Sequence, residues 1–309
     1  MVWHAGEPTV VGVRRLAELL DPFEDLRRNG RLRHAMQTNA TLIDDRWCEF
    51  LTGHEFRIGV SIDGPSHLNG HRLGRGGEPA HARIMRGIDR LRVHGVTFSV
   101  IAVVTTDSVS HPEVLLDFFA SLGCDGVGFN IEETEGVSVS RRTPTFEQAV
   151  EFWRRTIAWT RRNNDLTVRE VDRLGGYLRA LRSGDGWRST LIDPIPTISA
   201  MGDVVLLSPE LAGSTAPAYD NFRAGNVLEQ SIASMLENAS RLRYVDEFLT
   251  GLDRCEASCE FFGFCRGAQA GNRYFETGRF DTTETNYCRV SRQALVVALS
   301  DTVREEQAT

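Results

Sequence analysis

Residues 57–65, Arg-Ile-Gly-Val-Ser-Ile-Asp-Gly-Pro, combine an apolar strand pattern with a polar turn. Residues 57–62 form the strand candidate, and Asp-Gly-Pro is a sequence typical of turns. Ser61 and Asp63 therefore stand where the strand ends, which is the part of a parallel α/β fold where active sites are built.

The same pattern recurs through the first half of the chain. Strand candidates and helix candidates alternate with short connections, which predicts repeated βαβ units, a parallel sheet and an α/β fold class. Ser110 and Glu113 have the spacing of a capping box, and Gly123 stands where the helix at 112–122 would close. The other strand candidates are 2–3, 33–37, 96–104 and 126–131, and the other helix candidates are 11–20, 44–51 and 80–93.

Polar residues follow each of the five strand candidates, at 4–8, 38–41, 61–65, 105–106 and 130–133. Each of these stretches alone is more typical of a simple turn. Five in succession, each at a strand end, favour one shared cleft. The sequence identifies no catalytic acid or base in it.

A long amphipathic helix pattern follows, with Phe146, Val150, Trp153 and Ile157 on one stripe. Trp153 and Trp159 could be taken for a cofactor box, but packing in a core or an interface is the better interpretation.

The turn at 3–8, Trp-His-Ala-Gly-Glu-Pro, resembles the Gly-Gly-Glu-Pro turn of radical S-adenosylmethionine (SAM) enzymes, with Ala5 in place of the first glycine. Residues 37–41 and 59–65 are similar to the next two segments of that family in order and spacing. The resemblance implies that the turn meets the SAM amino group and that Ser61 and Arg72 hold its carboxylate, which suits a hydroxyl and a guanidinium. The alternative for Arg72 is a solvated loop charge. The cofactor-binding residues implied in this way are Gly6, Glu7, Pro8, Asn39, Ser61, Asp63 and Arg72.

Four of the six cysteines lie within the last 55 residues, as Cys255-x3-Cys259-x5-Cys265-x22-Cys288. Four thiolates suit a [4Fe–4S] cluster and also a structural zinc. The spacing departs from the paired C-x2-C of common zinc ribbons and favours iron–sulfur; unliganded core thiols are the remaining alternative. Cys48 and Cys124 stand alone, and Cys48 is best interpreted as a small buried hydrophobe.

The residues around these cysteines resemble the SPASM-type extension of radical SAM peptide maturases. The resemblance rests on 260–267, Asn272 and 283–289, and 208–213 and 225–227 extend it upstream. Together they look most like the maturases of glycine-rich-repeat peptides, a cyclophane-forming branch. The segment 198–209 contains no cysteine, so the sequence supports one auxiliary cluster and no second one.

Radical SAM enzymes carry three closely spaced cysteines upstream of the Gly-Glu-Pro turn, and here that turn already occupies residues 6–8. We therefore expect a partial (β/α) barrel that lacks its first strand, an N-terminally truncated chain, and no turnover by the polypeptide as given. The expected domains are the partial barrel at 1–164, bridging helices at 165–198, and a SPASM-like iron–sulfur domain at 199–309.

The resemblance implies that the complete enzyme uses SAM and a second [4Fe–4S] cluster. It would install a carbon–carbon crosslink in a ribosomally made precursor peptide, with an electron donor protein as a further partner. Three alternatives remain: a non-catalytic peptide-binding relative, a zinc-stapled interaction module, and another peptide maturase that forms thioethers or formylglycine.

Charge and composition narrow the remaining classes of partner. The net charge is −7, which argues against general binding to nucleic acid or to an anionic membrane surface. No apolar run approaches the ~20 residues of a membrane span, and no signal peptide opens the chain. We therefore expect a cytoplasmic protein that binds neither nucleic acid nor membrane.

Overall fold

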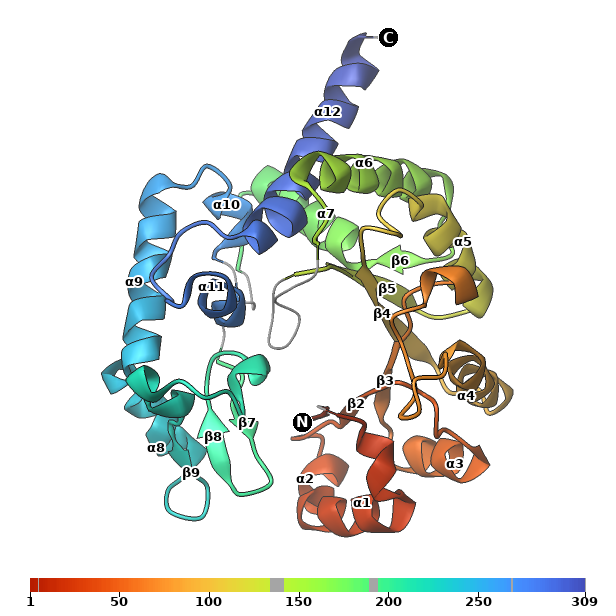
Figure 1. Ribbon diagram of the computed structural model, residues 1–309, viewed down its shortest axis with the longest axis vertical. Coiled ribbons are helices and arrows are strands. Elements are labelled where there is room, and N and C mark those ends of the chain that lie inside the picture. The colour runs from red at the N-terminus through yellow and green to blue at the C-terminus, as the bar shows by residue number, and fades with distance from the viewer. Residues whose placement is uncertain (5, 134–141, 189–193, 268, 309) are drawn as a thin grey trace. The chain divides into compact units, whose positions relative to one another are not determined.

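The structure is a computed structural model that describes residues 1–4, 6–133, 142–188, 194–267 and 269–308 (Figure 1). Ala5 therefore lies outside the described residues. The chain divides into two compact units. Unit 1 comprises residues 1–130 and 155–172, and unit 2 comprises residues 131–154 and 173–309. The domain bounds expected from the sequence stay a prediction.

Unit 1 is built on a six-stranded sheet in which the strands follow one another in chain order. The register is parallel, with Met36 beside Ile58 and Gly59 beside Ser99. This arrangement confirms the α/β fold class. The strands are β1 (Val2–Trp3), β2 (Ala35–Thr38), β3 (Arg57–Ser61), β4 (Phe98–Val104), β5 (Gly126–Ile131) and β6 (Thr167–Val168).

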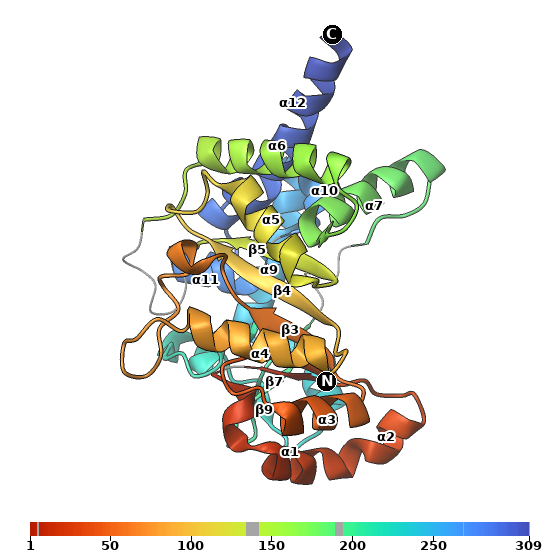
Figure 2. The same cartoon turned by 90° about the vertical axis from the view of Figure 1, so that its right-hand side faces the viewer.

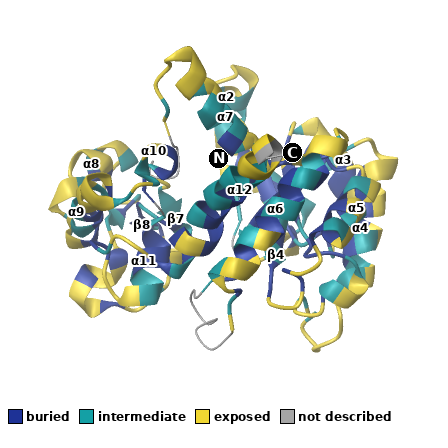
Figure 3. Ribbon diagram, turned by 90° about the horizontal axis from the view of Figure 1, so that it is seen from above, coloured by how far each residue is buried: buried dark blue, intermediate teal, exposed yellow. Residues whose placement is uncertain are grey.

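Helices connect these strands and cover one face of the sheet. Figure 2 shows α3, α4 and α5 following one another along the strands, and Figure 3 shows that α4 and α5 each have a buried and an exposed side. Ile88 of α4 and Phe119 of α5 are fully buried, as is Val60 of β3. Apolar burial of this kind is the main stabilising contribution to the unit. The helices are α1 (Val13–Leu20), α2 (Glu24–Arg28), α3 (Asp45–Gly53), α4 (His81–Val93), α5 (Pro112–Leu122) and α6 (Phe146–Arg162).

Unit 2 contains a small antiparallel sheet and a set of helices. The sheet runs in the order β7-β8-β9. Its core is aromatic, with Phe222 and Phe280 fully buried and in edge contact with each other. The elements are α7 (Arg169–Ser183), β7 (Thr197–Ile198), β8 (Asp203–Val205), β9 (Gly225–Asn226), α8 (Ile232–Glu237), α9 (Arg243–Ser258), α10 (Phe262–Cys265), α11 (Ala270–Thr277), the π-helix η8 (Cys288–Gln293) and α12 (Ala294–Ala308).

Short 3-10 helices lie between these elements. They are η1 (Pro8–Val11), η2 (Asp21–Phe23), η3 (Ser66–Leu68), η5 (Pro209–Leu211), η6 (Pro217–Phe222) and η7 (Ala239–Arg241). None of the described helices has the length and apolarity that crossing a membrane requires.

One local prediction is wrong. The N-cap of α5 is His111 and not Ser110, and no side chain caps that end. Glu113 instead forms an ion pair with Arg155 of α6, which also donates to the Ser110 carbonyl. A long-range charge pair has replaced the local capping box, whereas Gly123 does close α5 in the left-handed conformation as predicted.

The two tryptophans of α6 confirm the packing interpretation. Trp153 is fully buried and donates from Nε1 to the Val290 carbonyl at 2.9 Å, within unit 2. Trp159 donates to Asp117 at 2.8 Å, within unit 1. Both indoles are therefore satisfied core side chains.

Candidate functional site

Glu7 ties together the ends of the first two strands in unit 1. One of its carboxylate oxygens accepts hydrogen bonds from the Thr38 hydroxyl at 2.7 Å and from the Thr9 backbone N–H at 3.0 Å. The other accepts from the backbone N–H of Asn39 at 2.7 Å. Glu7 is also the N-cap of η1, whose first residue is Pro8. The carboxylate therefore acts as an internal clamp, and it shapes the turn that Gly6 enters with a φ of +57°.

Asn39 forms a local turn directly after β2. Its side-chain oxygen accepts from both the backbone N–H and the hydroxyl of Thr41, at 2.9 and 2.7 Å. This Asx-type arrangement fixes the loop and leaves the side-chain NH2 of Asn39 as the donor that can face a ligand.

Ser61 is held by Gln37 of the neighbouring strand. Gln37 Nε2 donates to Ser61 Oγ at 2.8 Å, so the serine O–H still has its own proton to donate. The Gln37 amide lies across Gly59, where an added Cβ would come within 2.0 Å of Gln37 Oε1. Gly59 is thus required for this placement of Gln37.

Asp63 and Arg72 form a two-pronged ion pair. Arg72 donates from Nε and Nη2 to the two carboxylate oxygens of Asp63, at 2.8 and 2.7 Å. Asp63 also accepts from the backbone N–H of Val103 at 2.9 Å, and its own N–H donates to Asn69. Because Asp63 occupies only part of the five-donor guanidinium, the Nη1 hydrogens of Arg72 remain for a ligand.

A cavity of about 920 Å³ opens beside these groups, and we name it the strand-end cavity. Glu7, Asn39 and Arg72 line it, so it brings together three of the predicted cofactor-binding residues. Asp63 is linked to the cavity through Arg72, whereas neither Ser61 nor its partner Gln37 is among the residues that line it. Gln37 and Asn69 are positioning residues that the sequence reasoning missed, because their role depends on contacts across strands and loops.

Arg169 is a further polar residue of unit 1 that the sequence reasoning missed. It donates from Nη2 to Asn130 Oδ1 at 2.9 Å and pairs with the buried Glu170. Its guanidinium lies over Gly128, where a Cβ would approach within 2.4 Å. Arg169 follows β6, a two-residue strand that gave no recognisable sequence pattern.

The four clustered cysteines line one cavity of about 470 Å³ in unit 2, which we name the cysteine cavity. Cys255 lies in α9, Cys259 caps it, Cys265 ends α10, and Cys288 opens the π-helix η8. The structure thus brings together all four predicted metal ligands, although Cys288 is 23 residues from Cys265 in the sequence.

Burial favours the protonated form of three thiols of this cavity. It raises the pKa of Cys265 to about 11 and also raises the pKa of Cys255 and Cys288. Two of these thiols have local polar contacts: Cys255 donates to the Thr283 carbonyl, and Thr285 donates to Cys288. Metal binding would displace these protons and leave thiolates, as it does in other cysteine sites.

The donor set of the cysteine cavity fits a [4Fe–4S] cluster, because four cysteine sulfurs line it. Four cysteine sulfurs are also the ligand set of a structural zinc. Within the part of the chain that the structure describes, no group of three or more His, Cys, Asp or Glu is arranged to hold one metal ion.

Cys48 and Cys124 take no part in either cavity. Both are buried in unit 1, and burial raises the pKa of each thiol to about 11. They are inert core thiols, as predicted for Cys48.

Comparison with known proteins places the chain in a broad enzyme group. The family model described as Radical SAM superfamily matches residues 1–119. The uncharacterized protein sll1766 of Synechocystis sp. is 30% identical over 315 residues, which cover 99% of this chain and 79% of that protein. A serine-type anaerobic sulfatase-maturating enzyme of Bacteroides thetaiotaomicron is 31% identical over 128 residues, covering 41% of this chain and 31% of the enzyme.

Among solved structures, native anSMEcpe with bound AdoMet and Cp18Cys peptide is similar over 99% of this chain and 85% of that chain. The TM-score is 0.75 and the sequence identity 18%. At this identity the likeness concerns the fold, and it extends through both units of the chain.

Proposed function

The chain belongs to the radical SAM superfamily, and on this premise we propose that it acts on a ribosomally made precursor peptide, in which it installs a carbon–carbon crosslink. The observation that carries the proposal is the convergence of Cys255, Cys259, Cys265 and Cys288 on one cavity. The motifs around these cysteines resemble those of the crosslink-forming branch. The structural neighbour with a bound peptide supports a peptide substrate.

The proposed cofactors are SAM, its [4Fe–4S] cluster and an auxiliary [4Fe–4S] cluster at the four cysteines. When bound, these groups supply hydrogen-atom abstraction from the peptide and a site for the one electron released, together with a proton, as the crosslink forms. An electron donor protein would supply the electron that starts the reaction. The 309 residues hold no second group of three closely spaced cysteines, so we expect this polypeptide by itself not to cleave SAM.

In this proposal, residues in and beside the strand-end cavity bind SAM and orient it. The Gly6–Pro8 turn, held by Glu7, presents backbone groups to the SAM amino group. The Ser61 hydroxyl and the free hydrogens of Arg72 hold its carboxylate, and Asp63 keeps the guanidinium in plane. Asn39 offers its side-chain NH2 to the same cavity.

Formylglycine formation is the second candidate, because one relative is named a serine-type anaerobic sulfatase-maturating enzyme. Its match covers 41% of this chain and 31% of that enzyme. The crosslinking proposal draws instead on the motifs around the four cysteines in the segment 255–289.

The deciding experiment combines metal analysis with peptide binding, and neither needs turnover. Protein purified without oxygen should carry about four irons and four sulfides. It should bind a glycine-rich peptide that contains aromatic residues more tightly than a sulfatase-derived peptide, measured by fluorescence anisotropy.

Cys265→Ala should lose the iron, and Cys124→Ala, the matched control, should keep it. Stoichiometric zinc without iron would refute the cluster. Preference for the sulfatase peptide would refute the crosslinking branch and favour the second candidate.

A further inference from the structure

Arg273 of α11 carries a charge that is fully buried in unit 2. Its Nη1 donates to the Phe280 carbonyl at 3.0 Å, and its guanidinium lies 5.1 Å from the centre of the Phe248 ring. Its Nη2 donates to Cys255 Sγ at 3.4 Å. None of the ion pairs between described residues includes Arg273. Arginine stays protonated in proteins, and a buried charge without an anionic partner is strongly destabilising.

The surroundings are shaped for this guanidinium. Gly251 lies inside helix α9, where glycine costs roughly 0.5–1 kcal/mol relative to alanine. A Cβ at Gly251 would come within 2.0 Å of Arg273 Nη1. The helix therefore has glycine where the arginine needs room.

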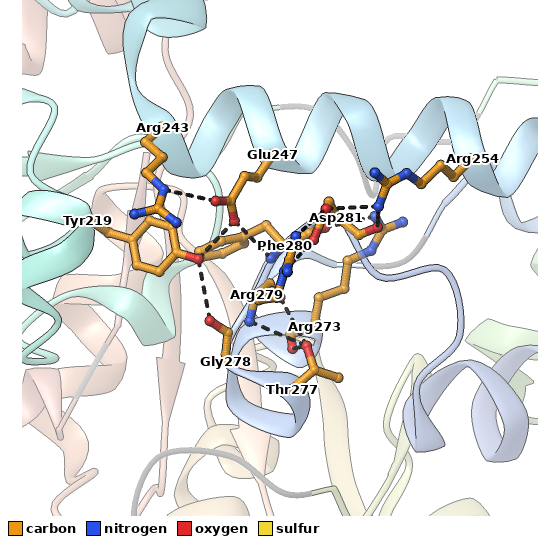
Figure 4. A network of polar contacts seen from close by, with 10 residues as sticks. All are labelled: Tyr219, Arg243, Glu247, Arg254, Arg273, Thr277, Gly278, Arg279, Phe280 and Asp281. Carbon is orange, nitrogen blue, oxygen red and sulfur yellow. Dashed lines mark hydrogen bonds and ion pairs between the residues drawn. The ribbon is translucent and has the colours of Figure 1, made fainter.

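The turn that holds Arg273 is itself fixed by a polar network (Figure 4). Arg279 and Arg254 both pair with Asp281, the residue after Phe280. On the other side, Glu247 accepts from the Tyr219 hydroxyl at 2.8 Å. These contacts hold the Phe280 carbonyl that receives the Arg273 hydrogen bond, so the guanidinium is presented to Cys255 in one orientation.

A second buried guanidinium borders the cysteine cavity. Arg292 of η8 lines the cavity, is 6% exposed, and donates to the Tyr287 hydroxyl at 2.6 Å. The anionic group that would compensate Arg273 is therefore a cysteine thiolate at the cavity wall. Metal binding would keep this cysteine deprotonated.

We propose that Arg273 is a positioning residue that compensates the charge of the auxiliary cluster and raises its reduction potential through a hydrogen bond to Cys255 Sγ. This rests on the proposed function, because it assumes the cluster at the four cysteines. Reduction adds one electron, from a one-electron donor such as the chemical titrant or the peptide radical, and breaks no bond to Arg273. A fixed positive charge in a low-dielectric site stabilises the more negative, reduced state more than the oxidised state.

The test is a potentiometric titration of the anaerobically reconstituted full chain, followed by electron paramagnetic resonance. Arg273→Met keeps length and apolar volume but removes the charge and the hydrogen bond. We expect its midpoint to fall by ~59 mV, which corresponds to a tenfold change in the one-electron reduction equilibrium. Arg273→Lys keeps the charge and should restore most of the wild-type midpoint.

Arg304→Met is the matched control, since it removes the same charge from an exposed side chain of unit 2 that lies outside this network. Its midpoint should equal that of the wild type. Should Arg273→Met fail to fold with a cluster, Gly251→Ala decides instead, because its Cβ would meet both the guanidinium and the Phe280 carbonyl that holds it. It therefore displaces the guanidinium without deleting it and should also lower the midpoint.

An unchanged or higher midpoint in the decisive variant would overturn the proposal. So would a lysine variant that falls as far as the methionine variant, since that would leave only a structural role. A wild-type protein without iron would instead refute the proposed function, so the two failures are distinguishable.

Discussion

The strand-end cavity of unit 1 and the cysteine cavity of unit 2 differ in how far the chain itself provides partners for their polar groups. In the first, the carboxylates of Glu7 and Asp63 accept hydrogen bonds from the chain's own donors. In the second, burial raises the pKa of Cys255, Cys265 and Cys288, and none of the ion pairs between described residues includes Arg273. The first cavity is organised by the chain alone, whereas the second, in the function proposed above, is completed by the cluster that it binds.

This difference predicts that cofactor removal affects the two units unequally. Chelation of the iron, or Cys265→Ala, should destabilise unit 2 on the order of several kcal/mol, because metal binding and local folding are coupled. Unit 1 should keep its own transition. Differential scanning calorimetry with and without chelator measures both.

The matched variant is Cys124→Ala, which removes a thiol from the core of unit 1. It should lower the stability of unit 1 by about 1–2 kcal/mol and leave the chelator effect on unit 2 unchanged. A cluster-free protein that melts at the same temperature as the loaded one would show that unit 2 does not depend on its ligand.

The next largest expected effect is the loss of folding stability when the Glu7 carboxylate, the internal clamp of unit 1, is replaced. Glu7→Gln keeps the shape but replaces a charged acceptor with an amide whose NH2 must face existing donors. We expect a loss of about 2–4 kcal/mol, since hydrogen bonds to charged groups contribute ~1.5–3 kcal/mol each and the loss is partly relieved by rearrangement. Urea unfolding checks this value.

Glu18→Gln on the exposed face of α1 is the control, and it should change the stability little because its partners Arg14 and Arg15 are solvated. Equal effects of Glu7→Gln and Glu18→Gln would mean that the turn at residues 6–8 is not held by its carboxylate.

SAM binding should depend on residues in and beside the same cavity, and the expected changes in binding free energy are smaller than the stability change above. Arg72→Ala is expected to weaken binding by about 1–3 kcal/mol and Ser61→Ala by about 1 kcal/mol, because the first removes a charge-assisted contact and the second a neutral one. Isothermal titration calorimetry is the measurement. Arg90→Ala, on the exposed side of α4, should bind as the wild type does, and tight binding unaffected by Arg72→Ala would place SAM elsewhere.

The smallest effect concerns acid stability of unit 1. Hydrogen bonds from Arg27, and a further one with His54, outweigh burial and lower the pKa of Glu24 to about 2 from its usual value of 4.5. A lowered folded-state pKa stabilises the protein above the unfolded value, so this contribution is complete above pH 4.5 and is lost as the pH falls toward 2.

We expect about 1–2 kcal/mol from Glu24 after allowance for solvent screening. In Glu24→Gln, the free energy of unfolding of unit 1 should change less with pH between pH 5 and 2 than in the wild type. Urea unfolding with a probe in that unit measures this. A wild-type slope in this range no steeper than that of the variant would show that the ion pair contributes nothing.

The sequence by itself determined the parallel α/β arrangement, the positions of the first five strands and of the helices α1, α3, α4, α5 and α6, and the set of four clustered cysteines. Strand and helix patterns are local, so residues 57–61 and 112–122 carry their own signal. Cysteines are rare enough that a cluster such as Cys255, Cys259 and Cys265 predicts a metal site before any fold is known, and the metal itself stays a prediction. The SAM-binding roles of Ser61 and Arg72 stay predictions.

Only the tertiary structure decided what each polar side chain contacts. The capping box at Ser110 failed because Arg155, 42 residues beyond Glu113, competes for the carboxylate. Asp63 turned out to hold Arg72 in place, and Arg273 to reach Cys255, because helices and loops distant in sequence converge there. Such pairings depend on long-range packing, which local patterns do not encode. They determine which charged groups have a partner within the chain and which are left to interact with a ligand.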